Sequence, residues 1–241
     1  MIRIIGLGLD PHRHCPARVI QFIKKADINL TFDPIGNILG FIHEIGGRSE
    51  SLQHLYPNHI DRKLSYANVS ERVITLARQH ERVTYLTYGN PCMLDEPVSN
   101  IVRSCRANKI PFEIIPGVGF IEEVFAENNI CVDHRGFRVC TARAIVESSV
   151  RPQFDELLLI AQPIELGSLN ADNFLVVSSS DLAILSTKLL EVRKNSAVII
   201  TQAKTAHTKR VCARATIETL PFFARAITPL TSIIVLTPDM E

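Results

Sequence analysis

Three side chains in the segment LQHLYPNHIDRKLSYANV could do chemistry together. Tyr56, Arg62 and Tyr66 all lie in this segment, and the whole chain has only four tyrosines. If a helix begins near Arg62, Tyr66 follows one turn later on the same face. A guanidinium beside a phenol can bind an anion, or it can stabilise an oxyanion while a phenolate takes a proton. On the residues alone, a solvated helix face with an amphipathic tyrosine is the simpler interpretation.

Two glycine- and proline-containing loops follow predicted strands. Residues 88–91 (YGNP) follow the strand VTYLT, and residues 116–120 (PGVGF) follow FEII. Glycine permits backbone conformations that are closed to other residues, and proline stiffens the exit of the loop. Each loop alone is an ordinary turn, but together they favour a crevice that binds a small molecule.

The opening GLG is a weaker signal. Gly6 and Gly8 follow a strand-like run, but His12 stands where a dinucleotide-binding fingerprint needs its third glycine. The segment therefore predicts a tight turn where the backbone comes close to a neighbour.

The elements that must position these residues alternate along the chain. The pattern predicts strands at 3–9, 26–32, 82–88, 112–115, 157–160, 174–178, 198–202 and 232–236. It predicts helices at 15–25, 70–79, 97–108, 120–128 and 182–194. Such alternation is typical of an α/β protein with largely parallel sheets. The two α/β halves meet near residues 117–120, and a ligand is expected at the loops after the strands.

Composition excludes several classes of protein. The 241 residues carry 26 Lys+Arg and 25 Asp+Glu, a net charge of +1, and 46% are hydrophobic. This apolar fraction excludes a disordered chain, and the balanced charge argues against a nucleic-acid partner. No apolar run is long enough to span a membrane, and the first residues lack signal-peptide features. The sequence therefore predicts a soluble, cytoplasmic protein without a membrane partner.

The cysteines and histidines do not indicate a metal centre. The six cysteines form no CxxC pair, and the cluster His12, His14 and Cys15 lacks a second group at finger-like spacing. We expect no metal ion and reduced thiols, some of them buried as small apolar residues.

The order of several motifs resembles the tetrapyrrole-methylase family of S-adenosylmethionine (SAM)-dependent methyltransferases. The matching pieces are GLGLD, ADINLTF, YLTYGNP, KIPFEIIPGVGF and SIIVLTP. The resemblance implies a two-domain α/β fold, in which each domain has a mainly parallel or mixed sheet flanked by helices. It also implies SAM in the interdomain cleft and a homodimer. The predicted domains are residues 1–117 and 118–241.

Within this superfamily, the middle region looks like the borosin peptide backbone α-N-methyltransferases, which methylate main-chain amides of a ribosomally made precursor peptide. The resemblance assigns catalysis to Tyr56, Arg62 and Tyr66. It assigns the cofactor contacts to Tyr88, Asn90, Met93, Leu94, Gly117, Gly119, Ala161, Gln162, Ala203, Thr231 and Ser232.

The sequence departs from the family patterns in three places. Leu9-Asp10-Pro11 replaces the wider family's opening GxGxGDP. Asn90 stands where the peptide enzymes often have His and the tetrapyrrole enzymes have Asp, and Gly119 replaces a usual Ser. Much of the expected cofactor contact is main-chain, so the binding site is expected to remain.

The sequence therefore predicts α-N-methylation of a separate precursor peptide, with a homodimer and a 2:2 complex with the precursor as the expected assemblies. The last predicted strand ends close to residue 241, which leads us to expect the substrate in trans. Two alternatives stay open. One is a tetrapyrrole or corrinoid C-methyltransferase of the same fold, because a ring carbon does not need the Tyr/Arg/Tyr set. The other is a catalytically silent SAM-fold binding module, because fold alone does not fix function.

Overall fold

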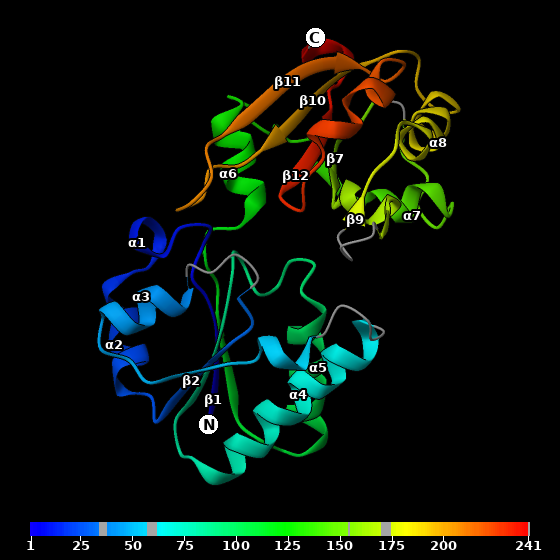
Figure 1. Cartoon of the computed structure of the whole chain (residues 1–241). Helices are drawn as coiled ribbons and strands as arrows, with labels where there is room; N and C mark the ends of the chain where they lie inside the picture. Colours follow the sequence, from blue (N-terminus) through cyan, green and yellow to red (C-terminus); the bar gives the residue numbers. More distant parts are fainter. Residues whose placement is uncertain (34–37, 57–61, 154, 170–174, 241) are drawn as a thin grey trace. The chain divides into compact units, whose positions relative to one another are not determined.

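The structure is a computed structural model that describes residues 1–33, 38–56, 62–153, 155–169 and 175–240. For Arg62 and Leu169 it describes the backbone but not the side chain. The chain forms two compact units, each with its own sheet (Figure 1). The first unit comprises Met1–Glu123 and Thr205–His207, and the second comprises Val124–Lys204 and Thr208–Glu241.

The first unit is built on a fully parallel five-stranded sheet of order β3-β2-β4-β1-β5. Its strands are β1 (Ile2–Gly6), β2 (Ile28–Thr31), β3 (Ser49–Ser51), β4 (Val83–Thr87) and β5 (Phe112–Ile115). The central strands are rich in branched apolar residues because a parallel sheet is buried on both faces.

Helices cover both faces of this sheet, as Figure 1 shows. They are α1 (Pro11–His14), α2 (Ala17–Lys25), α3 (Ile38–Glu44), α4 (Arg62–Gln79) and α5 (Glu96–Ala107). α2 and α3 pack on the face that carries Ile5, while α4 and α5 pack on the face that carries Ile2 and Ile4. The alternation of side chains along β1 therefore supplies a core to each layer.

Acidic side chains fix where three of these helices begin. Asp10 accepts a hydrogen bond from the His12 N–H at 3.1 Å, and Asp95 accepts one from the Val98 N–H at 3.0 Å. Asp33, just after β2, accepts one from the Ile38 N–H at 2.7 Å. Each carboxylate satisfies an N–H that has no partner within its helix, and its charge complements the helix dipole.

The second unit contains a mixed five-stranded sheet of order β11-β10-β12-β7-β6. Its strands are β6 (Phe137–Thr141), β7 (Leu157–Ala161), β10 (Ala197–Gln202), β11 (Val211–Thr216) and β12 (Thr231–Val235). Only β6 and β7 pair in parallel, and the other three pairings are antiparallel. A separate short pair joins β8 (Ser168–Leu169) to β9 (Leu175–Val176).

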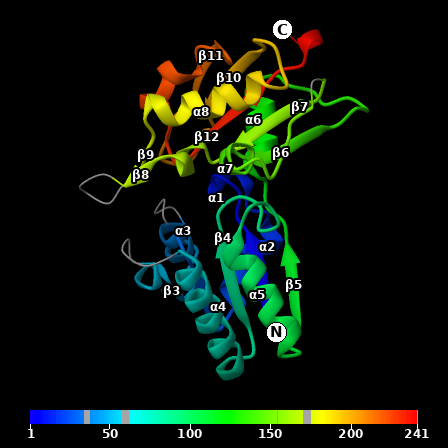
Figure 2. The ribbon, with the colours of Figure 1, turned by 90° about the vertical axis from the view of Figure 1, so that its right-hand side faces the viewer.

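Two helices, α7 (Ala142–Val146) and α8 (Ser179–Leu190), pack with one face of this sheet in a single apolar core. Figure 2 shows α8 lying along the sheet. Ser178 and Asp181 form a capping box at the start of α8, because each side chain accepts from the other residue's backbone N–H. The helix α6 (Phe120–Glu127) is followed by Asn128, whose amide donates to Thr201 Oγ1 of β10 at 3.1 Å.

The two-domain α/β fold with one parallel and one mixed sheet is confirmed. The prediction of largely parallel sheets holds for the first unit only. In the second unit β10 and β11 are joined by a short loop without a crossover helix, and such a connection makes neighbouring strands antiparallel.

Several elements were absent from the predicted set: α1, α3, β3, β6, α7, β8 and β11. Most are short, and β11 has the sequence VCARAT, which lacks the run of branched apolar residues that marks the other strands. The helix α4 also begins at Arg62, well before the expected residue 70.

Candidate functional site

Three strand-following loops converge at one edge of the first-unit sheet. Gly8 follows β1 and Gly89 follows β4, and the two residues form an isolated bridge. The Gly8 N–H donates to the Gly89 carbonyl at 3.2 Å, and the Gly89 N–H donates to the Gly8 carbonyl at 3.0 Å. We call residues 6–10, 88–91 and 116–119 the glycine loops.

Glycine is required where these loops touch. A Cβ on Gly117 would lie 2.5 Å from the carbonyl oxygens of both Gly6 and Gly89, which are backbone atoms that cannot rotate away. Gly8 and Gly89 also have φ angles of +76° and +68°, in the region that favours glycine. The sequence GLG therefore serves a close approach of backbones, as expected.

The loop after β4, one of the glycine loops, lies at the topological switch point of the sheet. β2 and β4 are neighbours, and the chain leaves β2 toward one edge of the sheet and β4 toward the other, with α3 and α5 on opposite faces. Connections that diverge in this way open a crevice outside the carboxyl ends of the two strands, where open α/β sheets bind their ligands. The N–H groups of Val118 and Gly119 have no hydrogen-bond acceptor in the described part of the chain.

The predicted cofactor contacts of the first unit all fall on or beside these loops. Tyr88 is half-buried, and its hydroxyl has a raised pKa because of burial and the negative charge of Glu123. The Asn90 side chain accepts from the Cys92 N–H at 3.0 Å, and the Asn90 carbonyl accepts from the Met93 N–H at 3.1 Å. Leu94 is 44% exposed and has a φ of +54°. A large apolar side chain in this conformation is unusual and points outward beside the loop.

The five predicted contacts of the second unit share one edge of its sheet. Ala161 ends β7, Thr231 begins β12, and Ser232 lies opposite Ala161 in the register of these strands. Ala203 follows β10, whose last residue pairs with Thr231. Gln162, directly after β7, has a φ of +54°. The sequence placed these residues on three separate segments, and the antiparallel pairing brings them together.

Thr231 is held in place by its own hydroxyl. Its Oγ1 accepts from the Thr228 N–H at 2.8 Å, and the residue is 2% exposed. Thr228 in turn donates its hydroxyl to the side-chain oxygen of Gln202 at 2.8 Å. These bonds fix the turn that leads into β12.

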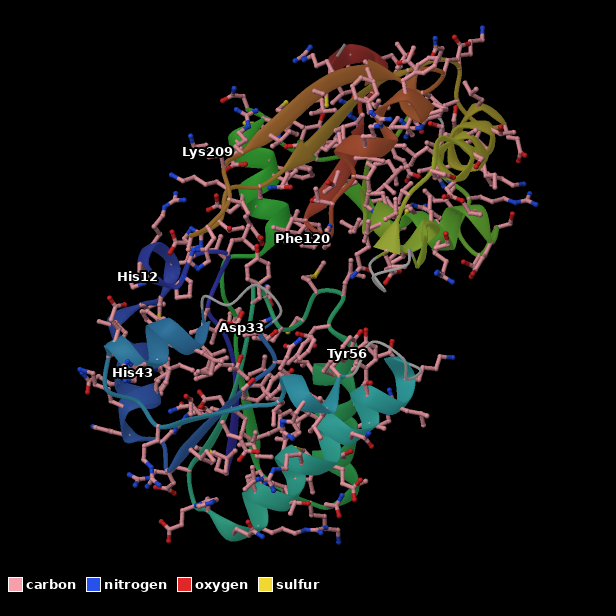
Figure 3. The ribbon with its side chains drawn as sticks, in the orientation of Figure 1. His12, Asp33, His43, Tyr56, Phe120 and Lys209 are labelled. Carbon is pink, nitrogen blue, oxygen red and sulfur yellow. The ribbon has the colours of Figure 1, made fainter. Side chains whose placement is uncertain are left out.

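Two of the three predicted catalytic side chains are in contact. The hydroxyl oxygens of Tyr56 and Tyr66 are 3.2 Å apart, and their ring centroids are 5.6 Å apart. Phe32, which follows β2, packs on Tyr56 with a centroid distance of 4.6 Å. Figure 3 shows Tyr56 beside the first turn of α4, which is the turn that carries Arg62. The Arg62 side chain lies outside the described part of the structure.

Buried ionisable groups lie beneath the phenol pair. Tyr85 on β4 has a pKa well above its ordinary value because it is buried, and the charges of Asp95 and Tyr66 raise it further. Burial also raises the pKa of Asp95, although hydrogen bonds from Thr87 and the Val98 N–H oppose this shift. The Thr87 hydroxyl donates to Asp95 at 2.7 Å. The interior of this unit therefore favours a neutral phenol at Tyr85.

Sequence reasoning missed a buried contact between a histidine and a carboxylate. His14 and Glu123 are joined by an Nε2–Oε1 distance of 2.9 Å, and their side chains are 8% and 15% exposed. In the sequence, His14 stands out only as one member of a possible metal-binding cluster. Its partner follows the PGVGF loop, and nothing in the spacing connects the two.

Other features of the described residues lie apart from these loops. No group of three or more His, Cys, Asp or Glu side chains among them could hold a metal ion, and the six cysteines are free. No helix in the described ranges is long and apolar enough to cross a membrane. A groove of about 430 Å³ between α4 and α5 is lined by polar side chains that include Ser70, Arg78 and Arg103, and by none of the predicted site residues.

A family model for the tetrapyrrole (corrin/porphyrin) methylases matches residues 1–221 of this chain. The chain belongs to this family. As a tetrapyrrole methylase it is a SAM-dependent methyltransferase by family and fold.

Solved structures agree with this tetrapyrrole-methylase fold over almost the whole chain. The uroporphyrin-III-C-methyltransferase from Thermus thermophilus matches with a TM-score of 0.70 and 18% identity, covering 97% of this chain and 93% of that one. The methyltransferase CobJ matches with a TM-score of 0.63 and 13% identity, covering 98% and 94%.

The residues present fit a SAM-type cofactor. The glycine loops bring backbone atoms close together, and the N–H groups of Val118 and Gly119 have no acceptor among the described residues. Such groups can bind the amino-acid and ribose portions of a cofactor by main-chain hydrogen bonds. The loss of the usual Ser at Gly119 therefore leaves the main-chain donors in place.

Proposed function

We propose that this tetrapyrrole methylase α-N-methylates backbone amides of a separate peptide, with SAM as methyl donor. The observation that carries the proposal is the Tyr56–Tyr66 phenol pair. Tyr66 lies on α4, which begins at Arg62, and both tyrosines belong to the unit that carries the glycine loops. A ring-carbon acceptor would not require such a set.

The chemistry explains why a phenol pair suits a peptide substrate. An amide nitrogen is a poor nucleophile, because its lone pair is delocalised into the carbonyl. SAM, when bound, would supply an electrophilic methyl group to the deprotonated amide nitrogen, and S-adenosylhomocysteine would be the leaving group. One phenol of the pair, as its phenolate, takes the amide proton. The hydroxyl group of the other phenol donates a hydrogen bond to that phenolate oxygen. Arg62, always cationic, stabilises the negative oxygen of the resulting imidate.

The cofactor in this proposal is held by the glycine loops. Tyr88, Asn90, Met93 and Leu94 contribute from the loop after β4, and Gly117 and Gly119 contribute main-chain atoms. The second-unit residues Ala161, Gln162, Ala203, Thr231 and Ser232 remain predicted contacts. A homodimer and a precursor peptide supplied in trans complete the proposed system.

A second candidate function is C-methylation of a tetrapyrrole ring. It is favoured by the similarity to a uroporphyrin-III-C-methyltransferase along nearly the full length of both chains. In that case the phenol pair is a packing feature of α4, and the glycine loops hold the cofactor in the same way.

The test separates cofactor binding from methyl transfer. Calorimetry with S-adenosylhomocysteine measures binding, and radiolabelled methyl transfer is measured to a random peptide library and to uroporphyrinogen III. We expect Tyr66→Phe and Arg62→Lys to bind S-adenosylhomocysteine within about threefold of the wild type. Peptide methylation should fall by about 10²-fold or more, as for loss of a general base.

Arg78→Lys is the matched control, because Arg78 lies in the last turn of the same helix and donates to Asn108. Its methylation rate should stay at the wild-type level. Wild-type methylation of peptide by both Tyr66→Phe and Arg62→Lys would overturn the catalytic assignment. Methylation of uroporphyrinogen III alone would select the second candidate. An absence of S-adenosylhomocysteine binding would indicate the silent binding module.

A further inference from the structure

We infer that His14 is a positioning residue that clamps the glycine loops into the geometry that accepts the cofactor. The inference rests on the proposed cofactor site. It concerns a side chain that takes no part in the methyl transfer itself.

Both ring nitrogens of His14 are engaged. Nδ1 accepts hydrogen bonds from the backbone N–H groups of Leu9 and Asp10, at 3.2 and 3.3 Å. An acceptor nitrogen carries no proton, so the proton of the neutral ring resides on Nε2. Nε2 then donates to Glu123 at 2.9 Å. The ring thus has one fixed tautomer, set by its neighbours.

These bonds join two loops that are far apart in sequence. Leu9 and Asp10 belong to the loop after β1, whereas Glu123 lies in the first turn of α6, directly after the loop that follows β5. The Glu123 N–H also donates to the Gly119 carbonyl at 3.4 Å. His14 is therefore a side-chain connection between the first and third glycine loops.

His14 also packs on the glycine bridge. A Cβ on Gly8 would collide with the His14 side chain, so the ring lies directly against this residue. Gly8 pairs with Gly89, and Glu123 acts electrostatically on Tyr88 of the same loop. A displacement of His14 would therefore disturb the positions of all three glycine loops.

The neighbouring histidine in α1 provides a contrast. His12 is 3.3 Å from Glu44, but these side chains are 56% and 65% exposed. Figure 3 shows His12 on the outside of α1. An exposed pair contributes little, because water screens it, whereas removal of one partner from a buried pair leaves the other without compensation.

The experiment compares His14→Asn, Glu123→Gln and the control His12→Asn. Asn places an oxygen near the position of Nδ1 and removes the link to Glu123, and Gln keeps the volume and one acceptor oxygen of Glu123. We expect His14→Asn to weaken S-adenosylhomocysteine binding at least tenfold in calorimetry. Glu123→Gln should weaken it severalfold, and His12→Asn less than twofold.

The double variant shows whether His14 and Glu123 act through the same interaction. If they do, His14→Asn/Glu123→Gln binds no more weakly than His14→Asn alone. Circular dichroism and the thermal midpoint establish that each variant is folded at the temperature of the measurement. Equal binding by wild type and a folded His14→Asn would overturn the inference, as would equal weakening by His12→Asn.

Amide hydrogen exchange tests the clamp without any cofactor. In the free protein, His14→Asn should accelerate exchange in residues 7–10 and 88–91, and leave β12 unchanged. Unchanged exchange in both loops would contradict the inference even if binding were lost. A wild type that binds no S-adenosylhomocysteine, together with accelerated loop exchange in the variant, would instead place the failure in the cofactor assignment.

Discussion

The four tyrosines of this tetrapyrrole methylase lie in two different environments. Tyr85 and Tyr88 have raised pKa values because burial disfavours the phenolate. The hydroxyl oxygens of Tyr56 and Tyr66 instead lie 3.2 Å apart, and Tyr66 is on α4, the helix that begins at Arg62. Four residues of one type thus divide into two that stay neutral and two that are candidates for proton transfer.

Arg193 is the clearest structural residue of the second unit. It is 1% exposed, and its guanidinium donates to the carbonyls of Gln153 at 3.0 Å and Leu236 at 3.3 Å, and to that of Glu156. We predict that Arg193→Met lowers the free energy of unfolding by about 2–4 kcal/mol, because buried carbonyls lose charged donors. Urea denaturation followed by circular dichroism measures the change.

Arg135 supplies the comparison for this prediction. It bonds Asp133 and Asp239 in an exposed network, where solvent screens the charges. Arg135→Met should change the free energy of unfolding much less than Arg193→Met does. An equal effect of the two substitutions would show that the buried carbonyls of the second unit do not depend on Arg193.

At the scale of elements, the glycine loops depend on backbone contact rather than on side chains. We predict that Gly117→Ala destabilises the first unit by at least about 2 kcal/mol, because the new Cβ meets two carbonyl oxygens at 2.5 Å. It should also weaken S-adenosylhomocysteine binding, since the contact lies in the proposed cofactor site. Urea denaturation and calorimetry check the two effects.

Gly40 is the matched control for this substitution. It lies inside α3, and a Cβ there would meet nothing within 4 Å. Gly40→Ala should therefore stabilise the protein by about 0.5–1 kcal/mol, through the helix propensity of alanine and a less flexible unfolded chain. Destabilisation by both alanines would mean that the loop contact is not the cause.

At the scale of the whole molecule, the six cysteines differ in how deeply each is buried within its own unit. Burial raises the pKa of Cys15 and Cys140 to about 11, and it also raises that of Cys105. The other three thiols, Cys92, Cys131 and Cys212, are exposed. Since the thiolate is the reactive form, a thiol with a pKa of about 11 is only about one thousandth ionised at pH 8.

We predict that iodoacetamide at pH 8 labels Cys92, Cys131 and Cys212 within minutes and the other three much more slowly. Reaction of Cys15 and Cys140 should accelerate as the pH rises toward 11, because the raised pKa delays ionisation. Peptide mass spectrometry of the folded protein follows each site, with a urea-unfolded sample as the control. Rapid labelling of Cys140 in the folded protein would show that the core around β6 opens.

The strongly patterned parts of this structure could be predicted from the sequence. Strands such as FEII, the helix at 97–108 and the loops GNP and PGVGF have local causes: branched apolar runs, an acidic cap, and glycine or proline at a turn. The same motifs supported the resemblance to the family, and two of them form part of the glycine loops. The short elements α1, α3 and β3 were missed, because a few residues give too weak a periodicity to detect.

Only the tertiary structure decided which distant residues meet. The Tyr56–Tyr66 hydroxyl contact depends on the packing of Tyr56, which precedes α4 in the chain, against that helix. The His14–Glu123 pair depends on parallel strands that bring the loops after β1 and β5 to one edge. In the second sheet β10 and β11 pair antiparallel because no crossover helix joins them, which contributes to making this sheet mixed. Local composition fixes the elements and their turns, whereas long-range pairing and packing determine which side chains form the site.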